Sequence, residues 1–146
     1  MLTIYLFAAV AIGAAFAAQP GINGAAAKIL GSPFPATVLS VAITLFASIL
    51  IMVWGRTMPS WETFTQLPWW IAIGGVIGVL VVAGGATIVP ITGAAVFFVC
   101  LIAGQLVGSV FLDHIGAFGL AQQDVSIMRI LGVLLTFGGV LLVRYG

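Results

Sequence analysis

The sequence predicts an all-α integral membrane protein with five transmembrane helices, on the basis of its composition and of the length of its apolar stretches. Of its 146 residues, 63% are hydrophobic and 5% are charged, whereas a soluble domain averages about 25% charged residues. The apolar stretches are too long for barrel strands and do not alternate strictly, so we expect helices. We treat residues 1–146 as a single transmembrane domain in contact with the lipid bilayer.

The first expected span covers residues 2–28. No Lys or Arg precedes its apolar run, so we interpret it as a membrane span rather than as a secretory signal. At a rise of 1.5 Å per residue it would be about 40 Å long, which exceeds the ~30 Å hydrocarbon core. Pro20 lies inside it and cannot donate to the carbonyl of Phe16, so we expect a kink near Gln19.

The second expected span covers residues 35–54, and a polar loop from Arg56 to Leu67 follows it. All four tryptophans surround this loop, and tryptophan prefers the membrane interface. The loop therefore marks one membrane face.

Residues 68–112 contain no charged side chain, and their number suits two spans of ordinary length. Gly84, Gly85 and Pro90 favour a tight turn between Gly84 and Val89. We therefore expect the third span at 68–83 and the fourth at 90–112.

The fifth expected span covers residues 125–144, with Asp124 as its N-cap because a carboxylate can accept first-turn N–H groups. Five spans place the termini on opposite sides. Arg56 and Arg129 then lie on the side of the N-terminus, and Lys28 and Arg144 lie on the other side. Orientation follows the Lys and Arg bias of short loops, so this balance predicts insertion both ways round and pairing of opposite copies. A weak preference for one orientation is the alternative.

Two polar pairs lie within the apolar spans, and each pair shares a helix face because its members are four residues apart. Gln19 and Asn23 could line a polar cavity beside the kink, or they could join helices or reach the headgroups. Gln105 and Ser109 lie in an otherwise apolar span, where an amide needs a partner. They could face a cavity or form an interhelical hydrogen bond. These four are the substrate-binding or cavity candidates.

Four further residues are candidates for gating or packing. Asp113 and His114 end the fourth span, where they could form a gate or a protonatable site or simply a solvated pair. Gly104 and Gly108 are spaced for close helix packing. One cysteine, one histidine and three acids form no metal cluster and no catalytic set, so we expect no metal, no cofactor and no enzyme activity. The net charge of +1 makes nucleic acid an implausible partner.

The chain resembles the short, single-domain YdcZ-like branch of the drug/metabolite transporter superfamily. The resemblance depends on residues 104–109, Gly-Gln-Leu-Val-Gly-Ser, on residues 113–119, Asp-His-Ile-Gly-Ala-Phe-Gly, and on the C-terminal residues 138–144. It implies a five-helix unit that works as an antiparallel dimer in a bacterial inner membrane and exports a small molecule. Small multidrug transporters are a more distant likeness. They use a glutamate within the first helix, whereas the only glutamate here is Glu62, in a loop.

The favoured function is therefore export by alternating access at the interface of an antiparallel homodimer, where transporters built from inverted repeats place their substrate site. Two alternatives remain open: a small dual-topology ion channel, and an accessory membrane subunit that does not transport. The substrate, the coupling ion and the direction of transport do not follow from the sequence.

Overall fold

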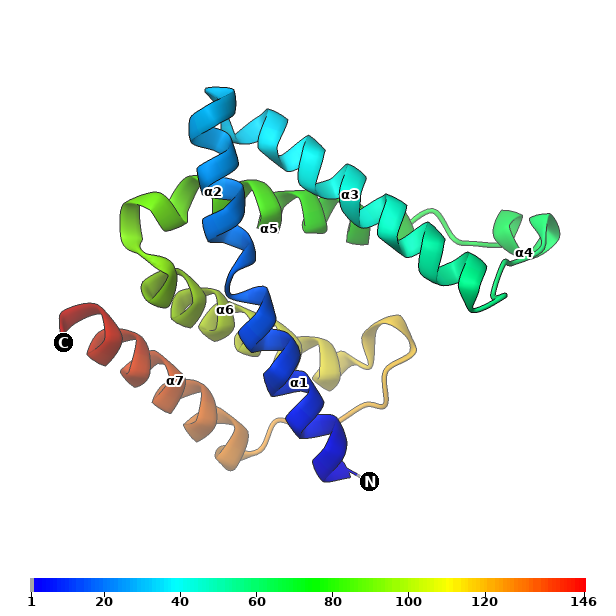
Figure 1. Cartoon of the computed structure of the whole chain (residues 1–146). Coiled ribbons are helices and arrows are strands. Elements are labelled where there is room, and N and C mark those ends of the chain that lie inside the picture. Colours follow the sequence, from blue (N-terminus) through cyan, green and yellow to red (C-terminus); the bar gives the residue numbers. More distant parts are fainter. Residues whose placement is uncertain (1) are drawn as a thin grey trace. The chain divides into compact units, whose positions relative to one another are not determined.

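A computed structural model describes residues 2–146 of the chain, and these residues form helices joined by turns and loops, with no strand among them (Figure 1). Five helical segments are long and apolar enough to cross a membrane, which confirms the prediction of five apolar helices. The chain divides into two compact units, residues 1–91 and residues 92–146.

The first apolar segment is broken close to the position predicted from Pro20. Helix α1 covers Leu2–Phe16 and α2 covers Gln19–Leu30, with two alanines between them (Figure 1). The turn is tight, since the N–H of Ala18 donates to the carbonyl of Ala15 at 3.3 Å. Pro20 is the second residue of α2, a position where its missing N–H is tolerated.

A short turn joins α2 to α3, which covers Pro33–Trp54. Gly31 closes α2 with a φ of 75°, a left-handed conformation that glycine adopts without strain. Ser32 then caps α3, because its Oγ accepts a hydrogen bond from the N–H of Phe34 at 3.3 Å. As a result, α2 and α3 pack against each other as an antiparallel pair. A short helix α4, Trp61–Thr65, occupies the polar loop that follows.

Helix α5 covers Ile71–Thr92 and corrects the predicted positions of the third and fourth spans. It continues through Gly84 and Gly85, so the turn expected between Gly84 and Val89 is wrong. The break lies at Gly93, whose φ is 80°. A glycine within a helix costs about 1 kcal/mol but need not end the helix, and α6 begins directly after Gly93, at Ala94.

The unit of residues 92–146 is a helical hairpin. Helix α6 covers Ala94–Ile115, a short 3₁₀ helix η1 covers Ala117–Gly119, and α7 covers Ile127–Tyr145. Gly116 ends α6 with a φ of 60°, and α7 packs against α6.

The N-cap of α7 differs from the prediction. Ser126, not Asp124, caps the helix, because its Oγ accepts from the N–H of Arg129 at 3.3 Å. The helix begins two residues later than expected, so Asp124 lies in the loop.

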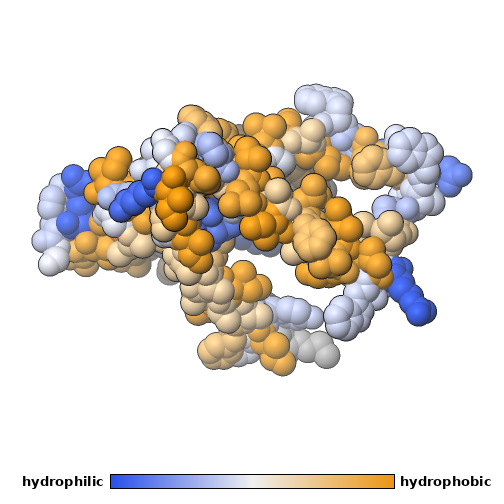
Figure 2. All heavy atoms as spheres, turned by 45° about the horizontal axis from the view of Figure 1, so that its top comes forward, coloured by the Kyte–Doolittle hydropathy of each residue, from blue (hydrophilic) through white to orange (hydrophobic). Residues whose placement is uncertain are grey.

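The helices expose most of their apolar side chains. Among the described residues, the buried hydrophobic ones are Ala36, Ala86, Val89, Phe97 and Ala103. Apolar residues dominate the face shown in Figure 2. Since such a surface is unfavourable in water, it is suited to lipid or to another membrane-embedded surface.

Candidate functional site

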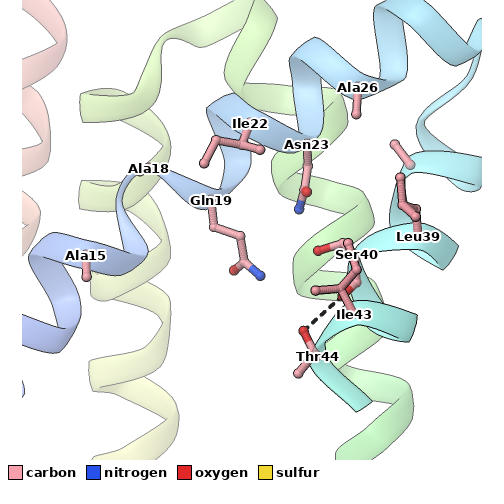
Figure 3. Close-up of a pocket in the computed structure, with 11 residues that line it drawn as sticks. Ala15, Ala18, Gln19, Ile22, Asn23, Ala26, Leu39, Ser40, Ile43 and Thr44 are labelled. Atoms are coloured by element: carbon pink, nitrogen blue, oxygen red, sulfur yellow. Dashed lines mark hydrogen bonds between the residues drawn. The ribbon is translucent and has the colours of Figure 1, made fainter. Parts of the chain in front are cut away.

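A polar pocket lies between α2 and α3 in the unit of residues 1–91 (Figure 3). Its volume is about 360 Å³. Seven of the eleven residues that line it are alanine, leucine or isoleucine, and the other four carry polar side chains, two from each helix: Gln19, Asn23, Ser40 and Thr44. The pocket thus brings together one of the two predicted polar pairs with a second pair from α3.

The helical break and the tight turn position these side chains. Gln19 is the first residue of α2, and Asn23 follows one turn later on the same face. Ser40 and Thr44 are likewise one turn apart on α3. Because α2 and α3 are packed together, the two polar pairs face each other across the pocket, as the close-up shows (Figure 3).

Asn23 is the most buried of the four polar residues, with 6% of its surface exposed. Its Nδ2 is buried and has no hydrogen-bond partner. The amide extends from α2 towards Ser40 (Figure 3). A buried donor without a partner costs about 1–3 kcal/mol. Among the described residues, this atom is therefore the strongest indication of a site for a ligand that accepts a hydrogen bond.

The two hydroxyl groups that α3 contributes to the pocket differ in the hydrogen bonds that they can make. Thr44 donates its Oγ1 hydrogen to the carbonyl of Ser40 at 2.9 Å (Figure 3). Its oxygen can therefore accept a hydrogen bond but has no hydrogen left to donate. The hydroxyl of Ser40 makes no hydrogen bond to a described residue, so it can donate or accept.

A second pocket of about 360 Å³ adjoins the first. It shares Gln19 and Thr44 with it and is otherwise lined by apolar residues and by Gly75 and Gly78 of α5. A close contact also joins α2 to α5, since a Cβ placed on Gly24 would lie 3.1 Å from Cγ of Pro90. The polar pocket therefore lies beside a third helix of the same unit.

The second predicted polar pair takes no part in this pocket. Gln105 and Ser109 lie on α6 and are exposed. The hydroxyl of Ser109 donates to the carbonyl of Leu106 at 3.0 Å. The side chain of Gln105 makes no hydrogen bond within the unit of residues 92–146.

Within the unit of residues 92–146, Gly104 and Gly108 lie on a face of α6 that α7 does not cover. A Cβ placed on either glycine would meet no atom within 4 Å. Within the hairpin, α7 packs instead on another face of α6, where Val107 and Val110 line a groove with residues of α7. The glycine face is therefore available for contact with something other than α7.

Asp113 and His114 lie in the last turn of α6. Oδ2 of Asp113 is 3.5 Å from Nη1 of Arg129 at the start of α7, and Nη2 of Arg129 donates to Oε1 of Gln123. The N–H of Gln123 also donates to the carbonyl of Asp113 at 2.9 Å. These contacts form a polar latch of Asp113, Gln123 and Arg129 that ties the loop to both helices. His114 is exposed and takes no part in the latch.

Three functional candidates did not follow from our sequence analysis. Ser40 and Thr44 have the same spacing of four residues as Gln19 and Asn23, and this signal could have identified them. The pairing of Arg129 with Asp113 depends on how the loop folds, and spacing along the chain gives no signal for it.

Comparison with known proteins identifies a family. A family model described as "Putative inner membrane exporter, YdcZ" matches residues 4–142. The matched stretch includes every residue that lines the polar pocket and the whole of the latch. The chain matches no curated protein and no solved structure.

Proposed function

The chain belongs to the YdcZ family of multi-pass inner membrane proteins, and from this premise we propose that it exports a small molecule by alternating access as an antiparallel homodimer. In this proposal the pocket between α2 and α3 holds the substrate. Each copy contributes one such pocket, and the two copies are related by a two-fold axis in the membrane plane.

The buried Asn23 is the observation that carries the proposal. Its Nδ2 is buried without a partner in a largely apolar helical unit, where an unsatisfied polar group is costly. The group also lies beside a broken helix, and transporters commonly build substrate sites from discontinuous helices near the midplane. A purely structural amide would instead be expected to hydrogen bond to a neighbouring helix.

Two observations support pairing of opposite copies. The balance of Lys28 and Arg144 against Arg56 and Arg129 supplies no bias towards one orientation. Within the unit of residues 92–146, α7 does not cover the face of α6 at Gly104 and Gly108, which allows a second backbone to approach closely.

A topology experiment tests the dimer. One C-terminal reporter is active only in the cytoplasm and a second is active only outside it. We expect the wild-type chain to activate both, and a variant with two lysines added after Gly146 to activate mainly the cytoplasmic one, because positive charge is retained inside. Activity of only one reporter with the wild-type chain would contradict dual insertion.

A transport experiment tests the site. Purified protein is screened by thermal shift against amines, sugars and metabolites, and each stabilising compound is then loaded into proteoliposomes to measure its efflux. We expect saturable efflux that Asn23→Leu removes and that Gln66→Leu, which removes an amide in the exposed loop, leaves unchanged. Ion flux at channel rates would instead favour a pore.

A further inference from the structure

The pocket between α2 and α3 carries an inference about the chemical class of the substrate. We infer that it takes a small neutral molecule that presents a hydrogen-bond-accepting oxygen to Asn23 and an apolar body to the remaining wall. The inference rests on the proposed function for its physiological role, but binding itself can be tested without transport.

The need for an accepting oxygen follows from Asn23. Its Nδ2 is a donor only, and it is both buried and unpaired. A carbonyl or hydroxyl oxygen of a ligand would satisfy it, whereas an ammonium group would bring a second donor against it. Ser40 lies opposite Asn23 (Figure 3), and its unengaged hydroxyl can bond to the same ligand group.

The charge of the pocket argues against ions of either sign. None of its eleven lining residues is ionisable. In the described part of the unit of residues 1–91 the charged side chains are Lys28, Arg56 and Glu62, and all three are exposed. An ion moved from water into an apolar site without an opposite charge is strongly disfavoured.

The break between α1 and α2 does not supply a charge that could balance a bound ion. The N-terminus of α2 begins at Gln19 and by itself would favour an anion. The C-terminal end of α1 meets it at the same break and carries the opposite partial charge. Since the two partial charges lie close together, they offset each other, and a neutral ligand remains the best match.

The size and lining of the pocket define the rest of the ligand. A volume of about 360 Å³ lies near the lower end of the range for small-molecule sites. Apart from its four polar residues, the wall consists of alanine, leucine and isoleucine side chains. A compact ring or short chain bearing one or two polar oxygens fits this combination.

Three probes of nearly equal size separate the classes. Nicotinamide is neutral and has an accepting carbonyl, nicotinate is its anion, and 3-(aminomethyl)pyridine is a cation at neutral pH. Ligand-observed NMR on the full chain in detergent measures the binding of each, and the same micelles without protein correct for partitioning. We expect nicotinamide to bind at least about tenfold more tightly than either ion.

Two variants locate the effect. Asn23→Leu has a similar volume without the donor and should weaken nicotinamide binding at least about tenfold. Asn23→Asp supplies a carboxyl group that can pair with the cation, so at a pH above the pKa of that buried carboxyl the preference should reverse and the cation should bind best. The control Gln66→Leu should bind all three probes as the wild type does, because Gln66 does not line the pocket.

The outcomes separate this inference from the proposed function. Equal or tighter binding of an ion by the wild-type chain would overturn the neutral class, and so would failure of all three probes to bind. Unchanged nicotinamide binding by both Asn23 variants would overturn the role of Asn23. None of these results affects dual insertion, which only the reporter experiment addresses.

Discussion

The pair α2–α3 and the pair α6–α7 are both antiparallel helical pairs in apolar sequence, but their polar side chains lie in different places. Between α2 and α3 the amide of Asn23 points into a pocket without a partner. Between α6 and α7 the cavity is a smaller groove of about 200 Å³, lined by valine, leucine and isoleucine alone. In that unit Asp113, Gln123 and Arg129 meet at the loop instead, where Asp113 and Arg129 are paired.

This difference teaches that spacing alone does not make a site. Gln105 and Ser109 have the same spacing as Gln19 and Asn23, but they lie on an exposed face of α6. A polar pair becomes a binding site only where a neighbouring helix encloses it. Elsewhere it is available to a second copy of the chain or to lipid headgroups.

The largest expected effect is on the free energy of unfolding, and it distinguishes Gly24 from Gly108. Gly24→Leu should lower the free energy of unfolding by about 1–3 kcal/mol, because its side chain would collide with Pro90 across the α2–α5 contact. Unfolding by titration with dodecyl sulfate measures it.

Gly108→Leu is the matched control, since no atom lies near its Cβ position. It should not destabilise the monomer but should weaken pairing of copies, which energy transfer between labelled chains detects. Equal stability of the Gly24 and Gly108 variants would contradict the contact between α2 and α5.

The next effect tests which residue starts α7. Ser126→Ala should cost about 1 kcal/mol of unfolding free energy, because it removes the acceptor for the N–H of Arg129. Asp124→Ala should leave stability nearly unchanged, since Asp124 lies two residues before the cap. A larger loss of unfolding free energy with Asp124→Ala would show that Asp124 is the N-cap, as the sequence predicts.

A smaller effect is expected for Gln105→Leu. An interhelical hydrogen bond in a membrane is worth about 0.6 kcal/mol, so loss of one such bond between copies should weaken dimerisation about threefold. Efflux should suffer less than in Asn23→Leu, because Gln105 does not line the pocket between α2 and α3. Complete loss of efflux in Gln105→Leu would place the substrate beside α6. It would contradict the assignment of the substrate pocket to the pair α2–α3.

The smallest effect concerns the polar latch. The side chains of Arg129 and Asp113 are 30% and 36% exposed, so Asp113→Asn should cost only about 0.2–0.5 kcal/mol. Because salt screens exposed charges, the wild type and the variant should become equally stable at high salt. A difference that persists at high salt would show that the latch does more than hold the loop.

The sequence by itself determined the class of the protein, the five apolar segments, the break near Pro20 and the family resemblance. These features depend on composition and on local covalent chemistry. Too few charged groups are present to hydrate a soluble surface, and proline lacks an N–H wherever it stands. The polar pair at Gln19 and Asn23 was visible for the same reason, since spacing along one helix is a local property.

Only the tertiary structure decided which polar residues meet. The break between α5 and α6 lies at Gly93 rather than at Gly84, and Gly93 has a positive φ, a conformation open to any of the nearby glycines. The burial of Asn23 and its approach to Ser40 depend on the packing of α2 against α3, and the pairing of Asp113 with Arg129 depends on the path of a loop. These are contacts between residues distant along the chain. In a chain of nearly uniform apolar helices, hydropathy is similar on every face and therefore does not indicate which faces pack together.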